Sequence, residues 1–203
     1  YGYFAYEDKH PGKWQPSNDI WMHGYWAWDW ADAYEKAASI DKLNKTIKLD
    51  TPYFHQGYIK GQRFRFINVF EEIDIPGEYY IDRVSGKLYF YPPDDILTGE
   101  AYVSTLDETM FSFTDCSNIS FENISFQYSR SGAVKIKDGN NILFSGCVFN
   151  CLGLDAVIME GGKNNGLVSC DMYDLAAGGV YIDAGDRKTL TPSGHYVENC
   201  NIH

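Results

Sequence analysis

The sequence of 203 residues has no long uninterrupted run of apolar residues and few cationic ones. A membrane-spanning helix needs about 18 or more apolar residues in a row, so we expect none here. Lys and Arg number 17 against 28 Asp and Glu, which gives a net charge of −11, and they form no cluster. Nucleic acids and anionic lipids are bound through clustered cations. We therefore expect neither a nucleic acid nor a membrane as a partner.

An initiator Met is also missing, and the first residues have neither the basic start nor the apolar core of a signal peptide. We therefore expect the sequence to begin inside a longer chain. Its length is enough for one large domain or two small ones with a hydrophobic core, which argues against disorder.

The five cysteines do not follow a strong metal-binding pattern. They are Cys116, Cys147, Cys151, Cys170 and Cys200. Structural zinc sites use paired CxxC spacings, which are missing, and an odd number cannot form a closed set of disulfides. The gap of four between Cys147 and Cys151 is weak evidence for a metal site. We expect no metal and no cofactor.

A repeat of 23 residues runs through the second half of the chain. Like residues recur at this step in five series: Val134, Val157 and Val180; Phe121, Phe144 and Leu167; Ile136, Met159 and Ile182; Asn118, Asn141 and Asn164; Gly139, Gly162 and Gly185. Short alternating strands lie between the Asn and Gly corners, with no helical periodicity. About 23 residues suffice for one coil of a parallel β-helix, whose coils stack about 4.8 Å apart. The repeat therefore predicts a parallel β-helix with apolar ladders inside and flat columns of side chains outside.

Three cysteines share one register of this repeat with Ile124. Cys147 and Cys170 follow Ile124 at steps of 23, and Cys200 follows at a step of 30. We interpret them as a ladder of small buried thiols, with a redox or metal role as the alternative. The Asn series predicts a ladder of stacked side-chain amides at a corner of the coil.

Residues 1–97 lack the repeat and contain all five Trp. Residues 78–91 alternate on either side of a turn at Gly86, which predicts a hairpin. The Ala-rich residues 29–40 favour a short helix. We expect a compact, β-rich and aromatic-rich domain over residues 1–97 and β-helix coils over residues 98–203.

Three motifs resemble a known family. They are DIWMHGYWAWDWAD at residues 19–32, NVFEEIDIPGEYYID and GKLYFYPP within residues 68–93, and GDRKTLTP at residues 185–192. In this order they resemble secreted right-handed parallel β-helix proteins similar to glycoside hydrolase family 141. The resemblance covers most of the chain.

The resemblance implies an extracellular, carbohydrate-active protein with an all-β fold. In that family a β-rich insertion domain interrupts a longer right-handed β-helix, so residues 1–97 would be the insertion and 98–203 the return to the β-helix. Such proteins normally continue through several coils with His- and Asp-rich loops. We therefore expect further coils of a longer parent chain to hold part of the catalytic apparatus.

The outward columns of the repeat hold the candidate catalytic carboxylates. Glu160 and Asp183 fall one repeat apart, so they would be stacked neighbours, with Lys137 in the same column and Tyr181 in the next. Two carboxylates about 5 Å apart suit the acid and nucleophile of a retaining glycosidase. We assign Lys137 and Tyr181 to substrate binding. The alternative is a solvated charge column in which Lys137 compensates Glu160.

The third coil carries an extra loop. Its step from Leu167 to Val197 is 30, so 30 − 23 = 7 residues are extruded, within residues 186–193. Insertions in a solenoid gather on one face, often the binding face. Asp186 is a third catalytic candidate, and Arg187 could bind sugar hydroxyls or a uronate carboxylate. An Asp186–Arg187 brace that shapes the corner is the alternative.

Asp155 and Trp26 are two further substrate-binding candidates. Asp155 lies at a corner where the neighbouring coils have glycine, and a backbone position with positive φ is the alternative explanation. The ring of Trp26 could stack on a sugar, and a place in the core of the small domain is the alternative.

These features favour a glycoside hydrolase that acts on an oligo- or polysaccharide. A polysaccharide lyase with a Lys or Arg base and calcium is the alternative enzyme. A non-catalytic glycan-binding or structural β-helix module is the alternative outside the enzymes, because one fold hosts many functions.

Overall fold

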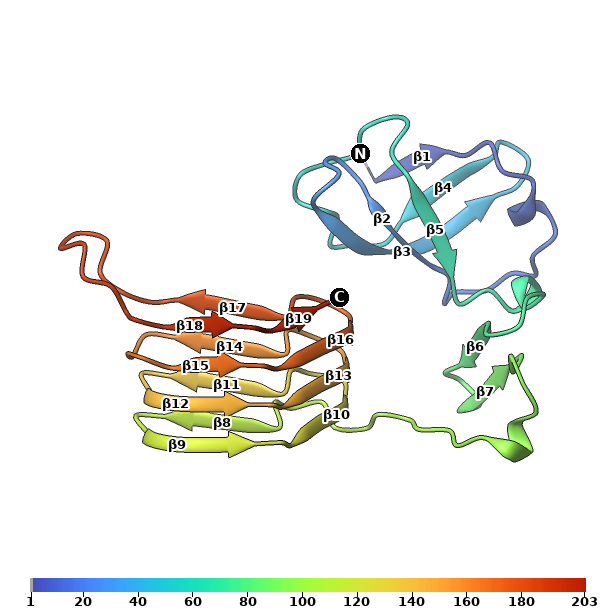
Figure 1. Ribbon diagram of the computed structural model, residues 1–203. Helices are drawn as coiled ribbons and strands as arrows, with labels where there is room; N and C mark the ends of the chain where they lie inside the picture. The colour runs from blue at the N-terminus through green and yellow to red at the C-terminus, as the bar shows by residue number, and fades with distance from the viewer. Residues whose placement is uncertain (1) are drawn as a thin grey trace. The chain divides into compact units, whose positions relative to one another are not determined.

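The computed structural model describes residues 2–203, and these divide into two units between Glu100 and Ala101. The boundary predicted from the sequence lies three residues earlier. The elements of each unit can be followed along the chain in Figure 1. Within residues 2–203 no helix is long and apolar enough to cross a membrane.

The C-terminal unit consists of three parallel sheets of four strands. The first sheet holds β8 (Phe111–Thr114), β11 (Val134–Lys137), β14 (Val157–Glu160) and β17 (Val180–Asp183); the second holds β9 (Ser117–Glu122), β12 (Asn140–Ser145), β15 (Gly166–Val168) and β18 (Tyr196–Glu198); the third holds β10 (Ser125–Ser129), β13 (Val148–Leu152), β16 (Asp171–Leu175) and β19 (Asn201–Ile202). Each coil gives one strand to each sheet (Figure 1). This arrangement is a parallel β-helix, as the 23-residue repeat predicts.

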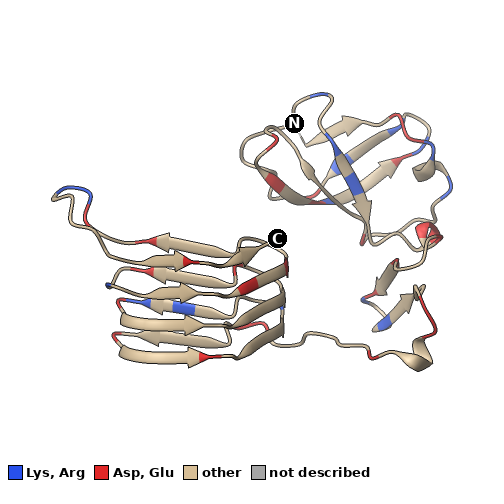
Figure 2. Ribbon diagram, in the orientation of Figure 1, with Lys and Arg blue, Asp and Glu red and all other residues tan. Residues whose placement is uncertain are grey.

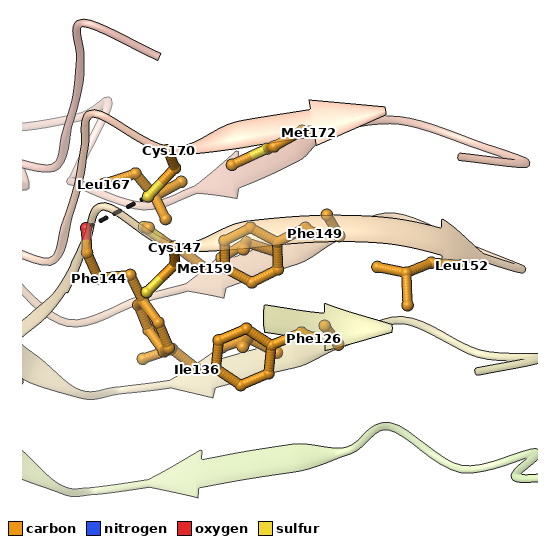
Figure 3. Packing of buried hydrophobic residues seen from close by; sticks show 14 of the residues in the cluster. Phe126, Ile136, Phe144, Cys147, Phe149, Leu152, Met159, Leu167, Cys170 and Met172 are labelled. Atoms are coloured by element: carbon orange, nitrogen blue, oxygen red, sulfur yellow. Dashed lines mark hydrogen bonds between the residues drawn. The ribbon is translucent and has the colours of Figure 1, made fainter. Parts of the chain in front are cut away.

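The strand registers confirm the predicted ladders. Val134 pairs with Val157, which pairs with Val180 on the next coil. Figure 3 shows how the buried side chains of successive coils lie one above another. The rings of Phe126 and Phe149 stack with centroids 4.9 Å apart, which is close to the spacing of the strands that carry them. The core is therefore a set of like side chains repeated once per coil.

Cys147 and Cys170 lie inside the β-helix, which confirms the predicted thiol ladder at these two positions. The Cys170 thiol donates to the carbonyl oxygen of Phe144 at 3.5 Å (Figure 3). Burial raises the pKa of the Cys170 thiol to about 11, so the reactive thiolate is disfavoured there. All five cysteines are free thiols.

The corner asparagines adopt left-handed backbone conformations. Asn118, Asn141 and Asn164 have φ of 60°, 55° and 55°, which Asn tolerates better than most residues. The side-chain amide of Asn141 donates to the Asn118 side-chain oxygen at 3.1 Å. The predicted amide ladder therefore exists between these two coils.

Asn165 is a buried polar residue that the repeat does not single out, because Ile142 holds the same register one coil earlier. Its side-chain oxygen accepts from the Ile142 N–H at 3.0 Å, and its amide donates to the Gly139 carbonyl at 2.9 Å. Its own N–H donates to Nδ1 of His195 at 3.0 Å. Since Nδ1 accepts, Nε2 of His195 carries the proton and donates to the carbonyl of Gly161. Asn165 thus links three successive coils.

The N-terminal unit contains an antiparallel sheet and a separate hairpin. The sheet has the order β1 (Tyr3–Ala5), β4 (Thr46–Leu49), β3 (Asp32–Asp41), β2 (Trp21–Tyr25) and β5 (Phe64–Ile67), and the hairpin joins β6 (Tyr79–Asp82) to β7 (Lys87–Phe90). Short 3-10 turns lie at η1 (His10–Gly12), η2 (Phe70–Glu72) and η3 (Ile96–Thr98). The hairpin predicted at Gly86 is confirmed.

The helix predicted over residues 29–40 is wrong, because this segment forms most of the long strand β3. The strand pairs with β2 on one side and β4 on the other. Those inter-strand hydrogen bonds and the burial of Ala37 override the helical preference of the alanines.

Glu35 of β3 is a buried carboxyl group in this sheet. The Tyr58 hydroxyl donates to it, and the same hydroxyl accepts from the Phe54 N–H at 3.0 Å. Burial raises the pKa of Glu35 above its usual range and raises that of Tyr58 to about 12. The fold therefore favours the neutral carboxyl form.

We predict that replacing Asn165 with Ala lowers the free energy of unfolding by about 2–4 kcal/mol, because a buried N–H and a buried carbonyl lose their partners. Thermal and urea unfolding of the whole chain measures this. Asn140→Ala is the matched control, with an expected loss below about 1 kcal/mol. Equal losses in the two variants would contradict the role given to Asn165.

We also predict a change in pH dependence for Glu35→Gln. A raised pKa in the folded state gives stability that is complete below the unfolded value of about 4.3 and is lost as pH rises through the folded value. Because Gln stays neutral, the variant should lose less stability than the wild type between acidic and neutral pH. The melting temperature across this range measures the difference, with exposed Glu7→Gln as control. A Glu35→Gln profile parallel to that of the wild type would refute the prediction.

Candidate functional site

Two carboxylates stand side by side on the outer face of the first sheet. Glu160 of β14 and Asp183 of β17 are partners in the parallel register. Neighbouring strands lie about 4.8 Å apart, so the two side chains project next to each other. The predicted register is confirmed, and the catalytic roles of both residues stay predictions.

Glu160 has a cationic partner, but it is not the predicted one. Nζ of Lys135 lies 3.0 Å from a carboxylate oxygen of Glu160. Lys137 is the register neighbour of Glu160, yet the ion pair forms diagonally across the two strands. Both partners keep about two fifths of their side-chain surface exposed, so solvent screens the pair and it contributes little to stability. Figure 2 shows the basic residues on β11 and the acidic ones on β14 and β17.

Asp183 has no ion pair and no side-chain hydrogen bond within the part of the chain that the structure describes. Tyr181, two residues earlier on β17, is in register with Ile158 and is half exposed. Because alternate residues of a strand point to one face, its ring lies on the same face as Asp183. This face therefore presents two carboxylates, the ammonium groups of Lys135 and Lys137 and an aromatic ring to solvent.

The extruded loop uses the carboxylate of Asp186 for its own structure. One oxygen accepts from the Lys188 N–H at 2.8 Å, and the other accepts from the Thr189 hydroxyl at 2.8 Å. These hydrogen bonds hold the pKa of Asp186 below its usual range. The geometry favours a loop-shaping role for Asp186, with Thr189 and Lys188 as partners in place of the expected Arg187. Arg187 is exposed.

Asp155 also serves the backbone. Its carboxylate accepts from the Gly178 N–H at 2.8 Å, which links two successive coils at the corner. A Cβ at Gly178 would crowd that oxygen and push the carboxylate away, so glycine favours the close approach. This hydrogen bond favours a structural role for Asp155. The alternative explanation, a backbone position with positive φ, does not apply, because Asp155 is not among the residues with positive φ.

The predicted role of Trp26 in sugar stacking is wrong. Its ring is only 4% exposed and packs against Phe64 in the core of the N-terminal unit. Its indole N–H donates to the carbonyl of Ala33 at 3.0 Å. A ring enclosed in this way cannot offer a face to a ligand.

A second polar cluster on the third sheet was missed by the sequence analysis. Asn201 donates to the Asp171 carboxylate at 3.0 Å, and Nε2 of His203 lies 3.5 Å from the same oxygen. The Tyr173 ring stacks on His203. The signal for it was the 30-residue step, which puts Asp171 and Asn201 in register. Its members are partly or fully exposed, and we give it no catalytic role.

Residues 2–203 contain no group of three or more His, Cys, Asp or Glu side chains placed to hold a metal ion.

Comparison with known proteins agrees with the fold. No curated protein and no solved structure matched the chain. Residues 109–203 match the family model described as "Right handed beta helix region". Regions of this kind occur in many carbohydrate-active proteins, such as pectate lyases and glycoside hydrolases. The C-terminal unit is thus a right-handed parallel β-helix, with the hand that the family resemblance implies.

Proposed function

We propose that the β-helix belongs to a secreted glycoside hydrolase similar to family 141 that acts on an oligo- or polysaccharide. The observation that carries this proposal is the register of Glu160 with Asp183 on an exposed, flat face. Side chains one strand spacing apart match the separation of about 5–5.5 Å between the carboxyl groups of retaining glycosidases. The exposed ring of Tyr181 on the same face offers a surface for the apolar face of a sugar.

The neighbours of the two carboxylates suggest how the roles divide. Nζ of Lys135 pairs with the carboxylate of Glu160, whereas Asp183 has no ion pair among the residues that the structure describes. We therefore assign Glu160 as the nucleophile. Asp183 would then donate its proton to the departing glycosidic oxygen and afterwards take a proton from the attacking water.

A polysaccharide lyase is the second candidate, because Lys135 and Lys137 present ammonium groups on the face that carries the carboxylates. Lyases remove a proton beside a uronate carboxylate and leave an unsaturated product. The reaction product therefore separates the two enzymes, since only elimination creates a double bond that absorbs in the ultraviolet.

We predict that Glu160→Gln and Asp183→Asn each reduce hydrolysis by about a hundredfold or more, because each removes one partner of the acid and nucleophile pair. The whole chain is incubated with neutral and uronate-containing glycans, and new reducing ends are measured. Glu198→Gln is the control, since Glu198 is an exposed carboxylate on another sheet.

The proposal would be contradicted if both variants still hydrolyse glycans, or if the wild type hydrolyses none of them. An unsaturated product that is lost on Lys135→Met and kept on Asp183→Asn would favour the lyase. Binding of glycan without any cleavage would favour a non-catalytic module.

A further inference from the structure

A cleft of about 860 Å³ lies in the N-terminal unit. Its lining comes from residues 11–20, from the later part of β3, from residues 68–71 and from one face of the β6–β7 hairpin. Ligand-binding clefts in proteins commonly measure about 300–1,000 Å³. None of the candidate catalytic residues on the β-helix belongs to this lining, so the cleft is a separate feature.

One wall of the cleft is a cluster of three aromatic rings. The centroid of Phe70 lies 5.4 Å from that of Tyr80 and 5.1 Å from that of Tyr89. Phe70 remains 50% exposed and Tyr89 39% exposed, in contrast to the enclosed Trp26. These rings therefore contribute surface to the cleft in place of filling the core.

The hairpin carries aromatic residues on both faces, and only one face meets the cleft. Tyr80 pairs with Tyr89, and Tyr79 pairs with Phe90. Alternate residues of a strand point to opposite faces, so Tyr79 and Phe90 point away from the Tyr80–Tyr89 face. Both are exposed and neither lines the cleft. The two faces thus provide a matched comparison within one hairpin.

Neutral polar side chains line other parts of the cleft. They are Gln15, Asn18 and Ser39. Within residues 2–203 none of these three side chains donates a hydrogen bond to, or accepts one from, another protein group. Amides and hydroxyls both donate and accept hydrogen bonds, as sugar hydroxyls do.

The charged groups of the lining are already engaged. Nζ of Lys42 donates to the carbonyl of Trp14. The Glu71 carboxylate accepts from the Gln15 N–H at 2.8 Å, and Asp82 accepts from the Ser85 hydroxyl. With two carboxylates against one ammonium group, the lining disfavours an anionic ligand.

The aromatic wall is fixed in place by Asn68. Its side-chain oxygen accepts from the Ile81 N–H of the hairpin at 2.9 Å, and its amide donates to the Asp19 carboxylate at 2.9 Å. Arg83 of the hairpin turn pairs with the same carboxylate. A wall held in this way needs little reorganisation on binding, which favours affinity.

We propose that this cleft is a binding site for a neutral glycan chain. Tyr80 and Tyr89 would stack on the apolar faces of sugar rings, and Gln15, Asn18 and Ser39 would exchange hydrogen bonds with hydroxyl groups. A proline-rich peptide fits less well, because the indole N–H of Trp14, the ring donor in this lining, already donates to Glu72. This site goes beyond the proposed hydrolysis and does not depend on it.

Isothermal titration calorimetry of the whole chain tests the proposal. The probes are neutral xylo-, manno- and cello-oligosaccharides, an oligogalacturonate and a proline-rich peptide. We expect saturable binding of at least one neutral oligosaccharide, weakened about tenfold by Tyr89→Ala and several-fold by Asn18→Ala. Tyr79→Ala should bind like the wild type. Each tyrosine variant removes one exposed ring from the hairpin, and circular dichroism verifies that both remain folded.

The proposal is overturned if no neutral oligosaccharide binds, if only the oligogalacturonate or the peptide binds, or if Tyr79→Ala weakens binding as much as Tyr89→Ala. Calorimetry needs no turnover, so the Glu160→Gln, Asp183→Asn double variant should bind with unchanged affinity while it hydrolyses nothing. Failure of the proposed hydrolysis can therefore be distinguished from failure of the proposed binding site.

Discussion

Parallel hydrogen bonding between successive coils is the constraint on which the β-helix depends. It sets each coil about 4.8 Å above the last and places residue i beside residue i + 23. Inside, this spacing suits stacked rings such as Phe126 and Phe149. Outside, the same spacing forces Glu160 and Asp183 together whatever their charge. The fold therefore imposes the repulsion between these carboxylates, and Lys135 partly offsets it.

The repeat in the sequence was sufficient to predict the sheets and their register, because in a solenoid one period determines every neighbour. It could not predict contacts between residues that are not partners in the strand register. Glu160 forms its ion pair with Lys135, which lies diagonally across the two strands, because the long lysine side chain can reach beyond its register partner. Asn165 interrupts an isoleucine ladder, and its role depends on two backbone groups of the preceding coil. The strand at residues 32–41 was mistaken for a helix because its pairing with the strands before and after it is not encoded in the composition of the segment itself.

The aromatic residues of the N-terminal unit show a second limit of prediction from the sequence. In the sequence Trp26 and Tyr89 each belong to an aromatic cluster, and nothing local separates core from surface. In the structure Trp26 is enclosed by the sheet, whereas Tyr89 stands on a hairpin with few neighbours. Which hairpin face meets the cleft is decided by Asn68 and Asp19, 49 residues apart. The hairpin itself was predictable, because its turn and alternation are local.

The candidate carboxylates differ in the hydrogen bonds and ion pairs that they already form. These partners separate catalytic candidates from structural residues better than the spacing in the sequence does. Asp155 and Asp186 accept hydrogen bonds from backbone N–H groups, and the corner and the loop rely on those bonds. A carboxylate held in this way cannot turn to a substrate without leaving an N–H unpaired. Glu160 is bound only by a flexible, exposed lysine, which costs little to displace. Asp183 is unengaged among the residues that the structure describes. If this face acts on a glycan, Glu160 and Asp183 are the carboxylates that the fold leaves available for it.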